Sequence, residues 1–318
     1  MKDIGGYLEF ERCRGLLLHD GAIALNSGRN CLAYLIRKRG IQKIYIPRFL
    51  CSSVENVCRQ EGVEIEFYSI NEKFLPDIDF KYDGWIYFVN YYGQISNDTI
   101  SAYKAKYGKI IVDNVQAYFQ KPCDSIDTIY TCRKFFGVPD GAFLCSEVGM
   151  DEKLPRDFSY ARLEHLAGRF EKEAPLFYPQ FLRAEDEIAN LPIRRMSVLT
   201  ENLLRAVKYD YVSAKRTENF DYLAKTYKST NKLDVVTPIG PYMYPLYVED
   251  GSVVRKKLQQ KRIYIPTLWP DVLKICTEND LEYDMALNIL PIPVDQRYGI
   301  EDMEYIVSTL NQSLRELM

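Results

Sequence analysis

The sequence predicts an α/β fold with a largely parallel sheet that helices cover on both faces. Short β-rich runs alternate with amphipathic stretches, and both sets are regularly spaced. Predicted strands lie at 43–47, 63–70, 84–93, 109–114 and 127–132. Predicted helices lie at 30–40, 52–62 and 100–108, and each ends at a glycine. Strands that alternate with crossover helices favour a parallel sheet, which binds ligands beyond the carboxyl ends of its strands.

The pattern changes at about residue 196. A long helical pattern covers 196–227, with apolar side chains at spacings of three and four. A β-rich run at 241–250, a helix-to-strand unit at 255–266 and an amphipathic helix at 299–314 follow it. We therefore predict a large α/β domain over 1–200 and a smaller C-terminal α/β domain over 201–318, with a long entry helix.

Composition excludes several classes of protein. The 318 residues are 47% hydrophobic, which suffices for a substantial core. A net charge of -3 disfavours partners such as nucleic acid or acidic membranes. No window approaches the roughly 20 apolar residues of a membrane span, and the start has no apolar leader, so a cytoplasmic protein is expected.

The cysteines and histidines are equally informative. Eight cysteines occur without a C-x-x-C pair, which disfavours a disulfide framework or a zinc ribbon. Two histidines make a histidine-rich metal centre or a Ser-His-Asp triad hard to assemble, so we expect no metal. The common glycine-rich nucleotide motifs are absent from the sequence.

Polar side chains follow two neighbouring predicted strands. Asp113 ends one β-rich run, and Gln116 follows three residues later. Thr131 and Lys134 stand at the end of the next strand. Each residue has an ordinary alternative: a helix cap for the aspartate, a strand position for the threonine, a solvated charge for the lysine. Together they place a carboxylate, a hydroxyl and an amine on the rim where such a sheet binds ligands.

A possible anion site lies further upstream. The residues Ser27, Gly28 and Arg29 precede a predicted helix. A helix start offers free backbone N–H groups and the positive end of the helix dipole to a phosphate. The alternative is a plain serine cap with the glycine in a tight turn.

Six segments, in one order along the chain, resemble those of the DegT-type sugar aminotransferases, which are pyridoxal phosphate (PLP) enzymes of fold type I. The segments are LNSGRNCLAYL, IYIPRFLCSSVENV, FVNYYGQISN, IVDNVQAYF, TCRKFFGVPDGAF and RRMSVLTENLL. They resemble the family's phosphate loop, a strand and its following helix, the Tyr-Gly-Gln segment, the Asp-Ala-Ala-Gln-Ala segment, the lysine segment and the Arg-Met-Ser region. The resemblance implies a fold-type-I large domain and a smaller C-terminal domain.

The resemblance also implies roles for single residues. Lys134 would hold PLP covalently and carry the proton between substrate and cofactor. Asp113 would pair with the pyridine nitrogen, and Gln116 would contact the ring hydroxyl. Thr131 would bind the phosphate, together with the helix start at 27–29. This agrees with the chemistry of the residues, because a partly buried lysine beside a cationic ring has a lowered pKa.

Four departures from the family pattern stand out. Cys51 occupies the position of an aromatic that stacks on the cofactor ring, and Arg29 replaces the usual threonine. Ile193 falls where an asparagine commonly reaches the neighbouring subunit's cofactor phosphate, and residues 139–142 replace Gly-Glu-Gly-Gly. The stacking and phosphate positions therefore differ from those of the family.

Substrate contacts are predicted less directly. Tyr91 and Tyr92 are candidates for lining the substrate pocket, with core packing as the alternative. Arg195 is a candidate for contacting a diphosphate, as are Arg162, Arg169 and Arg194, with solvation or ion pairing as the alternative.

The resulting prediction is a PLP-dependent aminotransferase that acts as a homodimer. It would move an amino group from an amino acid, with glutamate the expected donor, onto a nucleotide-linked keto-sugar for polysaccharide or related biosynthesis. The alternative is a catalytically silent binding or scaffold protein with the same fold, which Cys51 and Ile193 favour. Sugar dehydration ranks last, because within the family it accompanies loss of the lysine that this chain retains.

Overall fold

The computed structural model describes residues 4–78 and 83–316 of the chain. In this part, eight strands form one sheet. They are β1 (Ile23–Leu25), β2 (Lys43–Pro47), β3 (Glu64–Ile70), β4 (Pro76–Asp77), β5 (Trp85–Val89), β6 (Ile110–Asp113), β7 (Asp127–Thr131) and β8 (Ala142–Cys145). Their order across the sheet is β1-β8-β7-β6-β5-β2-β3-β4, and the five central strands β3, β2, β5, β6 and β7 are parallel. Antiparallel pairings lie at both edges.

The predicted crossover helices are present. They are α1 (Gly28–Arg39), α2 (Ser52–Gln60) and α3 (Asn97–Tyr107). The Ser27 side chain caps α1 by accepting a hydrogen bond from the amide of Asn30, and Gly40 ends this helix in the left-handed conformation. The predicted strands and helices of this region are confirmed to within a few residues, because turn glycines and the hydrophobic pattern mark their ends.

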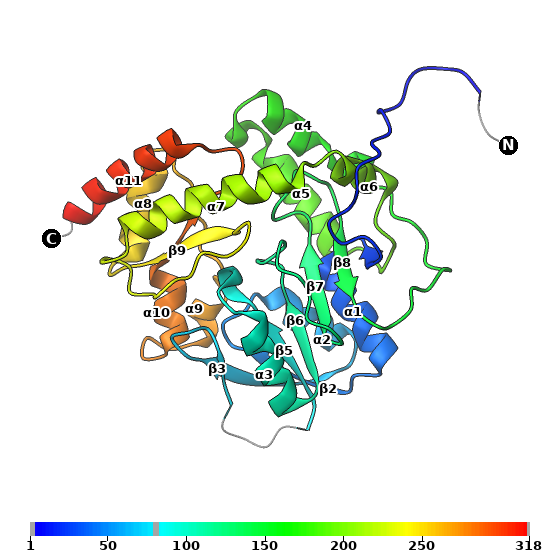
Figure 1. Ribbon diagram of the computed structural model, residues 1–318, viewed down its shortest axis with the longest axis horizontal. Helices are drawn as coiled ribbons and strands as arrows, with labels where there is room; N and C mark the ends of the chain where they lie inside the picture. Colours follow the sequence, from blue (N-terminus) through cyan, green and yellow to red (C-terminus); the bar gives the residue numbers. More distant parts are fainter. Residues whose placement is uncertain (1–3, 79–82, 317–318) are drawn as a thin grey trace.

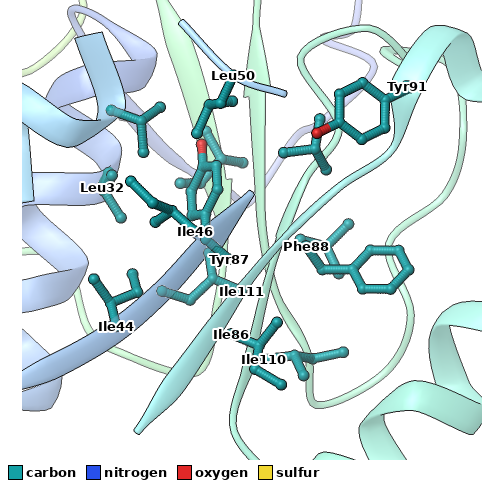
Figure 2. Packing of buried hydrophobic residues seen from close by; sticks show 14 of the residues in the cluster. Leu32, Ile44, Ile46, Leu50, Ile86, Tyr87, Phe88, Tyr91, Ile110 and Ile111 are labelled. Carbon is teal, nitrogen blue, oxygen red and sulfur yellow. The ribbon is translucent and has the colours of Figure 1, made fainter. Parts of the chain in front are cut away.

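Apolar side chains fill the space between the sheet and its helices. Figure 2 shows Ile44 and Ile46 of β2 on the side of the sheet toward Leu32 of α1, while Phe88 of β5 points to the opposite side. All four side chains are buried. Burial on both faces explains why the central strands read as nearly continuous apolar runs.

The strand order reverses next to β2. The chain passes from β2 to β3 on one side, whereas β5 pairs with β2 on the other. In open α/β sheets, ligands bind at the carboxyl edge near such a reversal. Strands β2, β5, β6 and β7 all end at this edge, and Asp113 and Thr131 are the last residues of β6 and β7.

A second, two-stranded sheet pairs β9 (Met243–Tyr247) with β10 (Ile289–Pro293). It packs with α7 (Tyr209–Thr226), α8 (Gly251–Gln260) and α11 (Ile300–Arg315) around a core of its own. Figure 1 shows these helices on the side of the molecule opposite β8 and α1. The predicted C-terminal α/β unit is therefore present, while its boundary at residue 201 stays a prediction.

The remaining elements lie in the connections between strands. They are the 3-10 turns η1 (Tyr91–Gly93), η2 (Tyr160–Arg162) and η3 (Ala174–Phe177), and the helices α4 (Glu164–Glu171), α5 (Tyr178–Ala189), α6 (Val198–Arg205), α9 (Val272–Ile275) and α10 (Leu281–Asn288). In the described part of the chain, no helix is long and apolar enough to cross a membrane.

The single helix predicted over 196–227 is wrong in one respect. The structure has two helices, α6 and α7, with a break at residues 206–208. Lys208 has non-helical torsion angles, and the carbonyl of Leu204 accepts both from the amide of Val207 and from the hydroxyl of Tyr209. The periodicity continues across the break because both helices present apolar side chains to the core.

The strand predicted at the end of 255–266 is also wrong. Residues Ile263 and Ile265 are buried and Tyr264 is exposed, so the alternation is real. This segment nevertheless pairs with no strand in the described residues. The alternating side chains are satisfied by packing into the second core without a hydrogen-bonded ladder.

Candidate functional site

The carboxyl edge of the sheet brings the predicted chemical groups together. Asp113 ends β6, and Lys134 follows the last residue of the neighbouring strand β7 by three positions. Cys51 is the N-cap of α2, four residues after β2 ends. Electrostatic coupling of Lys134 to Asp113, Cys51 and Arg29 places all four side chains in one neighbourhood.

Asp113 is a buried carboxylate with two donors. Its Oδ2 accepts a 2.8 Å hydrogen bond from the hydroxyl of Tyr87, and its Oδ1 accepts a 2.9 Å hydrogen bond from the amide of Val115. Burial raises the pKa of Asp113, whereas the charge of Lys134 and these two hydrogen bonds lower it. The donors fix the direction of the carboxylate, as a residue that must pair with a cation requires.

Lys134 combines solvent exposure with a strong influence of the surrounding protein. Its side chain is exposed, yet desolvation lowers its pKa. Its Nζ lies 5.6 Å from the ring centroid of Tyr242.

Three neighbours modify the pKa of Lys134 further. Asp113 and Cys51 raise it, and the guanidinium of Arg29 lowers it. Desolvation by the surrounding protein outweighs the two raising influences, so the net direction of the pKa shift is downward. An amine with a lowered pKa has more of its neutral, nucleophilic form at neutral pH, which suits attack on a carbonyl carbon.

The start of α1 lies against the ends of β6 and β7. A Cβ added at Gly28 would lie 3.9 Å from both Ile129 of β7 and Val115 after β6. The amide of Gly141 donates to the carbonyl of Asn26, and Gly141 accepts from the amide of Cys132, next to Thr131. The N-terminus of α1 therefore lies beside Thr131.

Gln116 and the two tyrosines after β5 are connected through the backbone. The side-chain oxygen of Gln116 accepts a 2.7 Å hydrogen bond from the amide of Tyr92, which has a left-handed φ of 54°. The hydroxyl of Tyr91 donates to the carbonyl of Phe49. Both tyrosines are 1% exposed, which favours core packing over substrate contact. Their assignment to the substrate pocket stays a prediction.

The predicted arginines divide into two groups. Arg162 is buried in an ion pair with Asp157, and Arg194 reaches the same carboxylate at 3.4 Å. Ion pairing, the alternative raised from the sequence, accounts for both. Arg195 forms no ion pair with another described residue, and its backbone bridges Leu25 and Arg156, so its contact with substrate stays a prediction.

Two residues near the site carry no sequence signal. Tyr87 points its hydroxyl at Asp113 from the neighbouring strand, and Tyr242 lies beside Lys134 although it is distant in sequence. Aromatic strand residues normally indicate core packing, and this chain contains 25 tyrosines. Only the pairing of β5 with β6 reveals the first contact.

No protein-family profile matches the chain, and no curated protein matches it in sequence. Solved structures do match. A DegT DnrJ EryC1 StrS aminotransferase from Brucella abortus is 16% identical, with a TM-score of 0.63 over 92% of this chain and 85% of that one. NtdA from Bacillus subtilis, solved with the bound cofactor PMP, is 15% identical, with a TM-score of 0.67 over 94% and 74%. The sugar aminotransferase CalS13 from Micromonospora echinospora is 15% identical, with a TM-score of 0.62 over 92% and 87%.

The chain has the fold of these aminotransferases. The predicted fold class, a large mainly parallel mixed sheet followed by a smaller α/β unit, is thereby confirmed. The likeness extends over both parts of the chain, since more than nine-tenths of it is covered. Function has to be argued from the residues at the carboxyl edge, because one fold hosts many activities.

Proposed function

We propose that the protein is a PLP-dependent aminotransferase. The observation that carries the proposal is that Asp113 and Lys134 lie at the carboxyl ends of two adjacent parallel strands. Lys134 is an exposed amine whose pKa is lowered by desolvation, and Asp113 is a buried carboxylate held by two donors. The fold supports the proposal, since a solved structure that shares it holds PMP, the amino form of this cofactor.

The residues present fit the cofactor. Asp113 offers an oriented carboxylate to a protonated ring nitrogen, and Lys134 offers an amine to an aldehyde. The N-terminus of α1 and the hydroxyl of Thr131 offer donors to a phosphate. When bound, PLP supplies an electron-withdrawing ring that stabilises negative charge on a substrate carbon.

The chain's own groups then bind and move protons. Lys134, in its neutral form, would accept a proton from the carbon of the amino donor. In its protonated form it would give that proton back later in the reaction. Asp113 would keep the ring nitrogen of PLP protonated, and this requires an ionised carboxylate. Tyr87 and the amide of Val115 favour the ionised form by donating to it.

The finer assignment concerns substrates and assembly. We propose an amino acid donor, with glutamate expected, and a keto-sugar acceptor carried on a nucleotide, as used in polysaccharide or related biosynthesis. The likeness to CalS13, a sugar aminotransferase, supports the acceptor class. We also propose a homodimer in the cytoplasm, and sedimentation of the purified protein tests the assembly.

A second candidate function is a binding or scaffold role without transamination. Two observations favour it. Cys51 replaces a stacking aromatic, and its Sγ lies 2.8 Å from the hydroxyl oxygen of Ser53. Ile193, in the position of a phosphate-binding asparagine, packs partly buried against the main core. An enzyme is nevertheless the better proposal, because Lys134 and Asp113 are both retained at the carboxyl edge of the sheet despite these changes.

The test is spectroscopic. Purified protein is mixed with PLP, its visible spectrum is recorded, and the mixture is reduced with borohydride and mapped by peptide analysis. The proposal expects one dominant reduced adduct, on Lys134. Lys134→Ala should lose the band and the half-reaction with glutamate while keeping its fold, and Lys121→Ala, an exposed lysine control, should keep both. Reduced label scattered over surface lysines, with none concentrated at 134, would favour the scaffold role.

A further inference from the structure

Arg216 is buried in an unusual way for an arginine. It lies on α7 with 2% of its surface exposed. Its guanidinium donates to neutral oxygens only: the side chain of Gln296 at 2.8 Å and the backbone carbonyls of Pro241, Tyr242 and Phe135 at 2.9, 3.3 and 3.2 Å. Desolvation lowers its pKa to about 10, so it remains charged at neutral pH. A buried charge is costly, and this one is stabilised by hydrogen bonds rather than by a direct ion pair.

The carbonyl of Phe135 receives a second donor. Gln296, which follows β10, donates its Nε2 to the same oxygen at 2.9 Å. The guanidinium also lies 4.7 Å from the ring centroid of Phe135. The residue directly after Lys134 is therefore held at its carbonyl by two side chains from the C-terminal part, and at its ring by one of them.

Arg216 also fixes a group beside the amine. It donates to the carbonyl of Tyr242, whose ring lies 5.6 Å from Nζ of Lys134. The charged groups that shift the pKa of Lys134 are Asp113, Cys51 and Arg29, and Arg216 is not among them. The influence of Arg216 on the amine must therefore be geometric.

We propose that Arg216, assisted by Gln296, is a positioning residue that holds Lys134 and Tyr242 in one arrangement and couples the amine to the packing of the C-terminal unit. This inference rests on the proposed function, in which Lys134 is the reactive amine. A displacement of about 1 Å in a reacting group can cost roughly a hundredfold in rate, so a small loosening at Phe135 has a measurable effect.

The test compares Arg216→Lys and Gln296→Ala with wild type. Arg216→Lys keeps a positive charge and loses the planar fork, and Gln296→Ala removes one of the two donors to Phe135. Lys215→Gln is the matched control, since Lys215 is the preceding residue on α7 and pairs with Glu218. Two quantities are measured on folded protein: the initial rate at which the borohydride-reducible PLP adduct forms on Lys134, and the pH profile of Lys134 acetylation by acetic anhydride without PLP.

The expected result is a roughly ten- to hundredfold slower formation of the adduct in Arg216→Lys, with a displaced acetylation profile. Gln296→Ala should change both readouts in the same direction by less, and the control should match wild type. A purely structural role would lower the melting temperature and leave the acetylation profile of the folded fraction unchanged. An acetylation profile equal to that of wild type in both variants would overturn the positioning role. If Arg216→Lys does not fold, the same result in Gln296→Ala alone would overturn it. Absence of a Lys134 adduct in wild type would instead overturn the proposed function and this inference with it.

Discussion

Asp113 and Lys134 stand at the ends of neighbouring parallel strands, and each shifts the pKa of the other toward the charged form. Burial opposes both: it raises the pKa of Asp113 and lowers that of Lys134. No direct ion pair joins the two side chains, so they interact across space. This arrangement leaves both groups able to meet a third partner, and it makes the titration of the amine a direct probe of the site.

Replacing Asp113 by asparagine should lower the pKa of Lys134 further, because the carboxylate raises that pKa and the amide does not. The acetylation profile of Lys134 should move to lower pH, while the half-reaction with an amino donor should slow by about a hundredfold or more, since the ring nitrogen loses its anion. The same profile in both proteins would mean that Asp113 does not face the amine.

Replacing Arg29 by glutamine should act in the opposite direction. The guanidinium lowers the pKa of Lys134, so its removal should raise that pKa and move the acetylation profile to higher pH. PLP should also be retained less well if this arginine substitutes for the missing threonine at the phosphate. Arg37→Gln, at the far end of α1 and paired with Glu61, is the control and should change neither quantity.

The sequence predicted the large sheet well because its signals are local. Buried parallel strands read as apolar runs, and glycines such as Gly40 mark where helices end. Asp113 and Lys134 were predictable for the same reason, since the end of a strand is visible in the sequence and the edge it faces follows from the topology.

The rest depends on contacts between distant segments. Asp140 lies in the turn 139–142, and its buried carboxylate accepts from the amide and the hydroxyl of Ser197 and from the hydroxyl of Thr200. Nothing near residue 140 indicates those partners. The network around Arg216 was hidden in the same way, because an arginine in a helix normally suggests a solvated side chain.

Tyr87→Phe should destabilise the protein by roughly 1.5–3 kcal/mol, because a buried carboxylate loses a charge-assisted hydrogen bond while the ring still packs. Urea unfolding at pH 7 measures the change. The pKa of Asp113 should also rise, since this hydrogen bond lowers it. Tyr45→Phe, whose hydroxyl meets the exposed carboxylate of Asp83, should cost less. Equal losses in the two variants would contradict a special role for the buried pair.

Gly141→Ala should destabilise the protein clearly. Gly141 has a φ of +109°, and an added Cβ would lie 2.9 Å from Thr200 and 3.2 Å from Met196. Strain and crowding together should cost roughly 2–4 kcal/mol. Gly137→Ala is the matched control, since its φ is ordinary and its nearest neighbour, Leu166, lies at 3.9 Å. Thermal melts measure both changes, and equal losses in the two variants would contradict the crowding at Gly141.

His19 should make the protein sensitive to acid. Its Nε2 donates to the carbonyl of Tyr118 at 2.9 Å, its ring stacks on Tyr130, and burial lowers its pKa to about 4 from 6.5. Between these two values the unfolded chain binds a proton that the folded chain does not. The free energy of unfolding should therefore be unaffected by this histidine above pH 6.5 and fall as the pH drops toward 4, by up to about 3 kcal/mol.

The variant His19→Phe isolates this contribution. Phenylalanine retains a ring against Tyr130 and cannot titrate, so the variant should be less stable than wild type at pH 7.5, where the carbonyl of Tyr118 has lost its donor. The difference between the two proteins should shrink as the pH falls from 6.5 to 4.5, because only wild type carries the histidine penalty. Urea unfolding across this range measures the slopes. Parallel slopes would show that His19 is protonated equally in the folded and unfolded states, and its burial among the aromatic rings would then be wrong.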